Sequence, residues 1–339
     1  MKILFRTDGN PQIGTGHIMR CLSLADALQE KGVCSTFIIA GPYMQPLIQK
    51  RCYECLVLDS AYDRLEEELP TLLPLLEEKQ PACVILDSYF VTTEYMTAIR
   101  SKVPLVYIDD LKMFDYPADL VINYMLYANR LDYPKNKHYL LGPQYAPLRK
   151  QFQEIPKRAE FGPARNVLVS AGGADPEHVT LECVRYLRKH KDGITYHVVL
   201  GAMNKDVFAI EGLAERQEQI ILHRQIKDMR SLMLSCDAAI SAGGTTLFEL
   251  CACGLPTVTY VLADNQIMNA ASFEDEGLML CVGDIRGDDN FTERLFTHMD
   301  TLVADSALRR NMSERMQSVV DGYGSRRLAA EIRKMCGSE

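Results

Sequence analysis

The stretch from Ile3 to Arg20 reads ILFRTDGNPQIGTGHIMR, and it decides the architecture that the rest of the chain repeats. Its short apolar run, Ile3 to Thr7, is typical of a strand. A glycine-containing loop follows, and apolar residues then recur at helical spacing on one face, up to a natural stop at Gly32: Ile18, Leu22, Ala25 and Leu28. The stretch therefore predicts a strand, a loop and a helix in succession, which is the first half of a βαβ unit.

The same alternation of short apolar runs and amphipathic stretches continues outward from this unit. The runs are continuously apolar, as in a parallel sheet that is covered on both faces. In the first half the expected strands are Ile3–Thr7, Cys34–Ala40, Cys55–Leu58, Cys83–Asp87 and Leu105–Asp109. In the second half they are Asn166–Ser170, Thr195–Leu200, Gln219–Leu222, Ala238–Ser241 and Thr257–Leu262.

Between about Tyr124 and Phe161 the pattern weakens, and prolines and charges accumulate around one short expected strand, His138–Leu141. We interpret this stretch as the connection between two domains. The sequence thus predicts an α/β protein with two Rossmann-like domains that face a cleft. The expected divisions are residues 1–150, residues 151–322, and a C-terminal helix within 323–339 that crosses back to the N-terminal domain.

Length and composition restrict the classes of protein that the chain can belong to. Its 339 residues exceed one typical hydrophobic core, so two domains are the natural expectation. A formal net charge of −8 disfavours a nucleic-acid partner. No segment reaches the roughly 20 apolar residues of a membrane span, and the N-terminus lacks the pattern of a signal peptide. The 11 cysteines are scattered along the chain, so we expect reduced thiols in the cytoplasm. We also expect the protein to be a monomer.

The first strand-to-helix loop offers both an anion site and an ionisable side chain. Gly14, Thr15 and Gly16 let backbone N–H groups approach an anion at the N-terminus of the helix. The third glycine of a dinucleotide fingerprint is absent, and His17 stands at the start of the helix. A tight turn with a capping histidine is the alternative, but a turn does not require an ionisable residue at this position.

Loops of the second half favour a nucleotide diphosphate. The run from Ser241 to Glu249, SAGGTTLFE, follows a strand, and its glycines and threonines can bind a diphosphate. Glu249 lies one turn into the following helix among apolar neighbours. It is therefore expected to be a buried acid that accepts hydrogen bonds from ribose hydroxyls, rather than a solvated helix residue.

Three further segments are less specific on their own. Gly172 and Gly173 follow the first strand of the second half, as in any strand-to-helix turn, and Pro176 suits the first turn of the next helix. Asn265 and Gln266 open another helix, where Asp264 or Asn265 could simply act as the N-cap. Tyr89 ends the segment Asp87-Ser88-Tyr89 after the fourth strand, where a half-buried tyrosine is common.

Taken together, these segments resemble a known family over nearly the whole chain. Residues 14–20 (GTGHIMR), 87–89 (DSY), 140–149 (LLGPQYAPLR), 241–249 and 264–266 (DNQ) are similar to the UDP-sugar hydrolase of pseudaminic acid biosynthesis and to spore-coat polysaccharide proteins of the same type. The second half also resembles the glycosyltransferase that makes lipid II. Both families have the two-domain glycosyltransferase-B fold.

The resemblance implies a substrate, a reaction and a set of site residues. The substrate would be UDP-2,4-diacetamido-2,4,6-trideoxy-β-L-altropyranose, with water replacing UDP at the anomeric carbon, with inversion and without a metal or cofactor. His17 would be the key catalytic residue, Tyr89 and Asn265 would contact the sugar or the water, and Glu249 would hold the ribose. The implied substrate-binding set is Gly14, Thr15, Gly16, Arg20, Gly172, Gly173, Ile226 (near the uracil), Ser241, Gly243, Gly244, Thr245, Thr246, Glu249 and Gln266.

Two other functions remain open at this point. A glycosyltransferase would use the same UDP-sugar with an acceptor other than water, and a nucleotide-sugar-binding protein would have no turnover. The presence of His17 alongside the phosphate loop disfavours the second. Asp109 and Asp110 are the nearest candidate for a metal-binding carboxylate pair, but their pattern is not a clear one.

Overall fold

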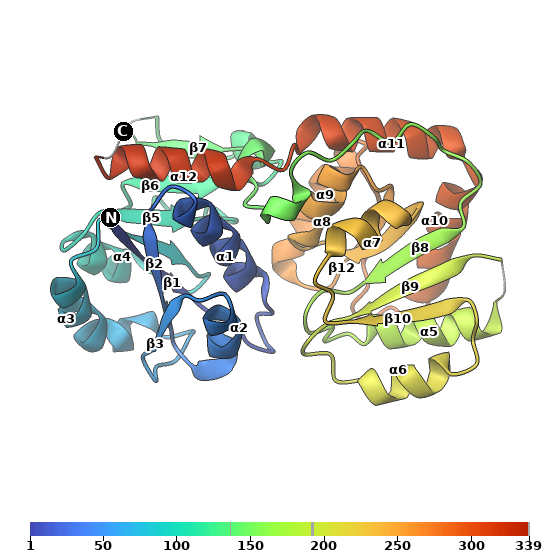
Figure 1. The fold of residues 1–339 in the computed structure, drawn as a ribbon, viewed down its shortest axis with the longest axis horizontal. Helices are drawn as coiled ribbons and strands as arrows, with labels where there is room; N and C mark the ends of the chain where they lie inside the picture. Colours follow the sequence, from blue (N-terminus) through green and yellow to red (C-terminus); the bar gives the residue numbers. More distant parts are fainter. Residues whose placement is uncertain (136, 191–192, 338–339) are drawn as a thin grey trace. The chain divides into compact units, whose positions relative to one another are not determined.

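The structure, a computed structural model, describes residues 1–135, 137–190 and 193–337 of the chain. Its residues form two compact units. Unit 1 comprises Met1–Lys150 together with Tyr323–Glu339, and unit 2 comprises Gln151–Gly322. Figure 1 shows a mixed helix-and-strand architecture in each of them. Among the described residues, no helix is long and apolar enough to cross a membrane.

Unit 1 contains a seven-stranded sheet of order β3-β2-β1-β4-β5-β6-β7, in which every described pairing is parallel. Its strands are β1 (Lys2–Thr7), β2 (Cys34–Ile39), β3 (Glu54–Val57), β4 (Cys83–Asp87), β5 (Leu105–Ile108), β6 (Leu120–Asn123) and β7 (Tyr139–Leu141). Its α-helices are α1 (Gly16–Gln29), α2 (Gln45–Lys50), α3 (Leu69–Lys79), α4 (Thr93–Arg100) and α12 (Gly324–Met335).

Helices cover both faces of this sheet, which explains why its central strands are continuously apolar. On one face, the four apolar residues expected on one side of α1 are fully buried: Ile18, Leu22, Ala25 and Leu28. On the other face, side chains of α3 and α4 form one core cluster with β1 and β4, including Leu72, Tyr95, Leu4 and Val84. Successive residues of β1 therefore point into two different cores.

Unit 2 contains a six-stranded sheet of order β10-β9-β8-β11-β12-β13, again with parallel pairings throughout its described residues. Its strands are β8 (Asn166–Ser170), β9 (Thr195–Leu200), β10 (Ile220–Arg224), β11 (Ala238–Ala242), β12 (Thr257–Val261) and β13 (Leu280–Asp284). Its α-helices are α5 (Val179–Lys189), α6 (Val207–Ala214), α7 (Met229–Ser235), α8 (Thr246–Cys253), α9 (Asp264–Asp275), α10 (Phe291–Ala304) and α11 (Ser306–Val319).

Each strand expected from the sequence is present within one or two residues of its expected bounds, but two strands were not expected. One of them is β6. No helix precedes it in residues 109–119, so the alternation of helix and strand that marks a parallel strand is missing there. The other, β13, lies at the sheet edge, is only partly buried, and ends in Gly283 and Asp284. The prediction that Pro176 lies in the first turn of a helix was wrong, because α5 begins only at Val179.

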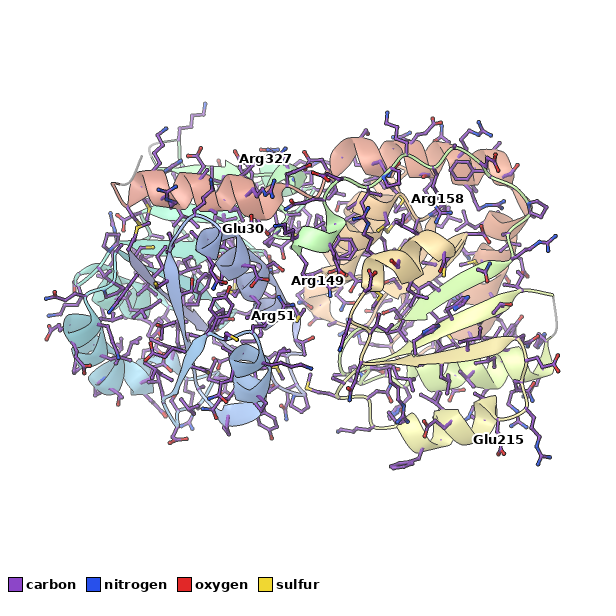
Figure 2. All side chains as sticks on the ribbon, viewed as in Figure 1. Glu30, Arg51, Arg149, Arg158, Glu215 and Arg327 are labelled. Carbon is purple, nitrogen blue, oxygen red and sulfur yellow. The ribbon has the colours of Figure 1, made fainter. Side chains whose placement is uncertain are left out.

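The C-terminal helix α12 packs against α1 within unit 1. Glu30, at the end of α1, is 3.6 Å from Arg326 of α12 and accepts a hydrogen bond of 2.6 Å from Lys150. Arg327, labelled with Glu30 in Figure 2, donates to the backbone oxygen of Gln144 over 2.9 Å. Close backbone contact requires glycine at Gly324, where a Cβ would lie 2.0 Å from the backbone oxygen of Ala146. Helix α12 is thus an integral part of unit 1.

Candidate active site

The first strand-to-helix loop of unit 1 is held by its own backbone. Asn10 and Gly14 exchange two backbone hydrogen bonds, of 3.2 and 2.8 Å. The side-chain oxygen of Asn10 accepts from the backbone N–H groups of Gln12 and Ile13. Gly14 has a φ of +74°, a conformation that favours glycine. The loop then ends at Thr15, the N-cap of α1, and His17 is the second residue of this helix.

His17 forms a buried pair with Asp87 at the carboxyl end of β4. Its Nδ1 atom lies 2.6 Å from Oδ1 of Asp87, and the side chains are 6% and 0% exposed. Because a carboxylate oxygen only accepts, this short contact requires a proton on Nδ1, and the longer approach of Arg20 Nη2 to the same nitrogen, 3.1 Å, is then not a hydrogen bond. A neutral His17 therefore has its lone pair on Nε2, as a general base must. The neighbouring ring of Tyr89 contacts His17 edge-on, with centroids 4.5 Å apart.

Arg20, one turn further along α1, supports this pair. Its Nε and Nη2 atoms each donate to Asp87 over 2.6 Å, and Nη1 donates to both carboxylate oxygens of Asp110 over 2.8 Å. Nη1 also donates to the hydroxyl of Tyr124 over 2.7 Å. Burial alone would raise the pKa of Asp87, but Arg20 and His17 outweigh it and hold that pKa well below its usual range. Asp87 is thus kept as a carboxylate.

The topology of the sheet explains how these residues meet. β1, β4, β5 and β6 are neighbours, and Thr7 pairs with Asp87 at the ends of the first two. Parallel strands bring their carboxyl ends to one edge, where ligands bind in α/β sheets. The carboxyl ends of these four strands and the segments that follow them supply, in order, His17 with Arg20, Asp87 with Tyr89, Asp110, and Tyr124.

Sequence reasoning found His17, Arg20 and Tyr89 but gave no role to Asp87 or Tyr124. Asp110 had been considered only as a metal ligand. In the structure Asp110 accepts from Arg20 and from the hydroxyl of Tyr89, over 2.8 and 2.7 Å. Arg20 was expected to bind substrate; with its side chain 4% exposed and its guanidinium bonded to two carboxylates, its contacts favour a supporting role. That expectation remains untested. An acid at the end of a buried strand was the available signal for Asp87.

The adjacent Asp109 belongs to a different cluster. Its carboxylate accepts from the hydroxyls of Tyr116, over 2.8 Å, and Tyr133, and from the backbone N–H groups of Leu111 and Lys112. These contacts order the connection that leaves β5. Neighbouring acids thus have separate partners, and the described residues contain no group of three or more His, Cys, Asp or Glu side chains that could hold a metal.

In unit 2, the loop Gly243–Thr245 joins β11 to α8, with Ser241 buried at the end of the strand. The backbone N–H of Gly243 donates to the oxygen of Tyr260 over 2.8 Å, and its own oxygen accepts from Asn269 over 2.9 Å. A Cβ at Gly243 would lie 3.2 Å from that oxygen of Tyr260, so the packing there favours glycine. Thr245 is the N-cap of α8, and the adjoining N-terminal turn can stabilise an anion.

The remaining residues predicted in unit 2 lie in loops at strand ends or in adjoining helix turns. Glu249 is in the first turn of α8 but is partly exposed, so the expectation of a buried acid was wrong. Asn265 and Gln266 are in the first turn of α9, whose N-cap is Ala263 rather than Asp264 or Asn265. The side chain of Gln266 accepts from the backbone N–H of Leu262 over 3.1 Å. Ile226 follows β10 and is partly buried.

The Gly172–Gly173 loop follows β8 and is packed against the loop after β9. A Cβ at Gly201 would lie 2.3 Å from the backbone oxygen of Gly172 and 2.4 Å from that of Gly173. Gly172 itself has a φ of +82°. Buried Asp175 then accepts from the backbone N–H groups of Val179 and Thr180, both over 2.9 Å, and so caps α5. These contacts account for the local conformation of the loop.

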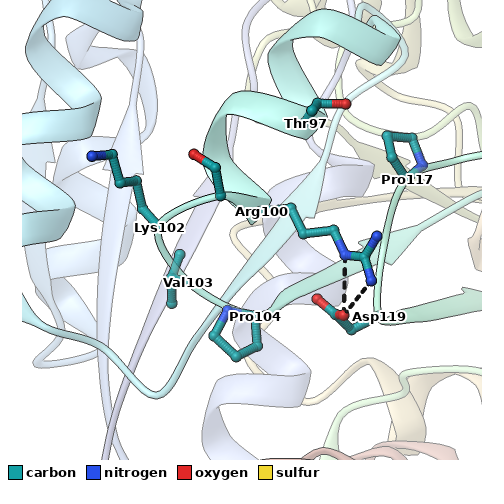
Figure 3. A pocket seen from close by; sticks show the side chains of 8 residues that line it. Thr97, Arg100, Lys102, Val103, Pro104, Pro117 and Asp119 are labelled. Carbon is teal, nitrogen blue, oxygen red and sulfur yellow. Dashed lines mark hydrogen bonds and ion pairs between the residues drawn. The ribbon is translucent and has the colours of Figure 1, made fainter.

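A hollow of about 530 Å³ in unit 1 lies away from these residues. Figure 3 shows it between the end of α4 and the start of β5, with Arg100 donating to Asp119 across it. It is therefore at the amino ends of the parallel strands, opposite to the edge that holds His17. The residues that line it are mostly polar side chains and prolines, with buried Val103. None of them belongs to the group that we call the His17 cluster: His17, Arg20, Asp87, Tyr89, Asp110 and Tyr124.

Comparisons with known proteins show what the chain is similar to. Residues 167–323 match the C-terminal domain of glycosyltransferase family 28. The spore coat polysaccharide biosynthesis protein SpsG of Bacillus subtilis is 24% identical over 98% of both chains. The UDP-2,4-diacetamido-2,4,6-trideoxy-β-L-altropyranose hydrolase of Campylobacter jejuni is 24% identical, over 74% of this chain and 87% of the relative.

Among solved structures, MurG of Acinetobacter baumannii is similar with a TM-score of 0.73, covering 98% of this chain and 99% of that one at 15% identity. At that identity the likeness shows the fold, which is the glycosyltransferase-B fold predicted from the sequence. The chain is thus an α/β protein of this fold with a glycosyltransferase family 28 C-terminal domain, and its homologues include the spore coat protein and the UDP-sugar hydrolase that its motifs resemble.

Proposed function

We propose that the chain hydrolyses a UDP-linked amino-deoxy sugar to the free sugar and UDP, by attack of water at the anomeric carbon. The reaction would serve nonulosonic (pseudaminic) acid or surface polysaccharide biosynthesis. One observation carries this proposal: the 2.6 Å contact from His17 Nδ1 to Asp87, which leaves Nε2 as the basic atom. The name of the Campylobacter jejuni relative supports the choice of reaction.

Unit 1 would activate the water. Nε2 of His17 accepts a proton from the water as its oxygen attacks the anomeric carbon, and the C–O bond to UDP breaks with the electron pair leaving on the diphosphate. Asp87 holds the ring in the required tautomer and stabilises the imidazolium that forms. The ring of Tyr89, in edge contact with His17, would orient the reacting sugar, and Asn265 is the other residue proposed to contact the sugar or the water.

Unit 2 would bind the UDP. The departing diphosphate needs stabilisation, which the backbone N–H groups of Gly243 to Thr246 and the dipole of α8 can provide. Glu249, one turn into the same helix, would accept from the ribose hydroxyls. Gly172, Gly173, Ile226 and Gln266 are proposed to complete the binding surface of this unit, with the backbone near Ile226 at the uracil.

A glycosyltransferase is the second candidate, because the family 28 domain and the fold are those of such enzymes. It would use the same His17–Asp87 pair to deprotonate an acceptor hydroxyl in place of water. A binding protein without turnover is less well supported, since recognition alone does not require a buried His–Asp pair with an arginine behind it.

Incubation with a panel of UDP-linked amino sugars, with and without sugar or lipid acceptors, separates the three functions. We expect release of UDP without an acceptor, and loss of about 10²–10⁴-fold in turnover in His17→Asn, which removes the general base. Affinity for UDP should change little in that variant, because the proposed UDP contacts are in unit 2. Release of UDP only in the presence of an acceptor would contradict hydrolysis.

A further inference from the structure

Asp110 joins two neighbours of the His17–Asp87 pair, Arg20 and Tyr89, through its carboxylate. Both of its carboxylate oxygens accept from Nη1 of Arg20, and Oδ2 also accepts from the hydroxyl of Tyr89. Its backbone oxygen accepts from the hydroxyl of Tyr127 over 2.6 Å, which fixes the residue itself. One carboxylate thus links Arg20, which supports the His17–Asp87 pair, to the aromatic ring of Tyr89, which contacts His17.

The charges of this buried cluster do not cancel while His17 is neutral. Arg20 contributes one positive charge, and Asp87 and Asp110 contribute two negative charges, at exposures of 4%, 1% and 3%. A buried net charge is costly, and an added positive charge relieves that cost. A proton received on Nε2 of His17 makes the total charge of the four groups zero. The second carboxylate therefore suits a cluster in which an imidazolium forms during the reaction.

We propose that Asp110 is a positioning residue of the reaction: through Arg20 it fixes the His17–Asp87 pair, and through the Tyr89 hydroxyl it holds the Tyr89 ring against His17. This inference rests on the proposed function, since it assigns Asp110 a task in that reaction. Asp110 acts through its neighbours and need not touch the substrate. The same inference assigns Arg20 a supporting role, which differs from the substrate contact that the sequence predicted for this residue.

The adjacent Asp109 provides a matched control. Asp109 is as buried as Asp110, at 1% exposure against 3%, and both residues directly follow strand β5. The carboxylate of Asp109 accepts hydrogen bonds from the side chains of Tyr116 and Tyr133, whereas that of Asp110 accepts them from Arg20 and Tyr89. Asp109→Asn and Asp110→Asn therefore remove the same charge at neighbouring positions, but only the second change reaches the His17 cluster.

Two readouts test the proposal in the full-length protein. The first is the NMR signal of the His17 ring in ¹⁵N-histidine-labelled protein without ligand, assigned by its absence in His17→Asn. The second is UDP release. In Asp110→Asn we expect shifted His17 ring signals and a fall in kcat of about 10–100-fold with little change in KM, as for other supporting partners of reactive groups. In Asp109→Asn we expect wild-type His17 signals and kcat, with lower thermal stability.

Folded Asp110→Asn with wild-type His17 ring signals would overturn the inference. If Asp110→Asn does not fold, Tyr89→Phe removes the hydroxyl that Asp110 holds while keeping the ring; shifted His17 signals would then support the proposal and unchanged signals would overturn it. If no UDP-sugar is hydrolysed by the wild-type protein, the proposed function fails, while the NMR comparison still decides whether Asp110 positions His17.

Discussion

In each unit a histidine that follows the first strand along the chain pairs with an aspartate at or after another strand, but only the pair of unit 1 is built like a reactive site. In unit 1, His17 follows β1 and lies 2.6 Å from Asp87. In unit 2, His178 follows β8 and lies 2.5 Å from Asp206. The side chains of the first pair are 6% and 0% exposed, and those of the second are 55% and 17% exposed.

The difference lies in what surrounds each pair. Asp87 is held as a carboxylate by Arg20, and a ring packs against His17. The exposed pair behaves as a surface ion pair, in which the hydrogen bond to Asp206 raises the pKa of His178. Water screens such a pair and competes for its hydrogen bonds. A short His–Asp distance therefore does not identify a general base; burial and a fixed supporting layer do.

The largest expected effect is on turnover, which should depend on the His17–Asp87 pair and not on the His178–Asp206 pair. Asp87→Asn loses the carboxylate that fixes the Nδ1–H tautomer, so turnover of the UDP-sugar should fall by about 10²–10⁴-fold, as when the orienting acid of a catalytic triad is replaced. Asp206→Asn, the matched change in unit 2, should leave turnover unchanged. Steady-state UDP release measures both variants, and equal losses would remove the distinction between the two pairs.

A second comparison assigns nucleotide binding to unit 2. Glu249→Ala should weaken UDP binding by about 1–3 kcal/mol, the range for losing a charged hydrogen-bond partner. Glu182→Ala is its control, because Glu182 is the first-turn acid of α5 as Glu249 is of α8. Calorimetry should find the control close to wild type. Unchanged UDP affinity in Glu249→Ala would contradict the assignment of the ribose to this residue.

Much of the fold and part of the candidate site could be predicted from the sequence, and the missing part has a physical reason. Local patterns revealed the strands, the glycine loops and His17, because a strand, a turn and an ionisable residue are adjacent in the chain. The partners of His17 are not adjacent: Asp87 meets it only because β1 and β4 pair in register. Asp110 comes from a connection without a helix, where the pattern that marks a βαβ unit is absent.

The expectation that Glu249 is buried failed for a related reason. Its neighbours Leu247, Phe248 and Leu250 are buried, and α8 is buried around most of its circumference, but Thr246 and Glu249 form a narrow, partly exposed strip. Composition around a residue therefore indicated a buried helix without indicating which of its positions faces the core.

The smallest expected effect is the pH dependence of stability, and it has opposite signs for the two pairs. The folded pKa of Asp87 is depressed, so its contribution is present above the unfolded value of about 3.9 and is lost as the pH falls toward the folded pKa. The folded pKa of His178 is raised, so its contribution is complete below about 6.5 and is lost as the pH rises through the folded value.

Urea unfolding at several pH values tests these signs. The free-energy difference between wild type and Asp206→Asn should be no more than about 0.5 kcal/mol at pH 5, given solvent screening, and should vanish in alkaline solution. The difference for Asp87→Asn should persist from pH 5 to neutrality and narrow only below about pH 4. A loss of the Asp87 contribution on raising the pH would contradict the predicted sign.

Reaction in ¹⁸O-labelled water tests the central claim most directly. If His17 and Asp87 activate water for attack at the anomeric carbon, mass spectrometry should find the label in the released sugar and none in UDP. The same label should appear, far more slowly, in Asp87→Asn. Label in the phosphate of UDP would mean attack at phosphorus, and the role assigned to the His17–Asp87 pair would then be wrong.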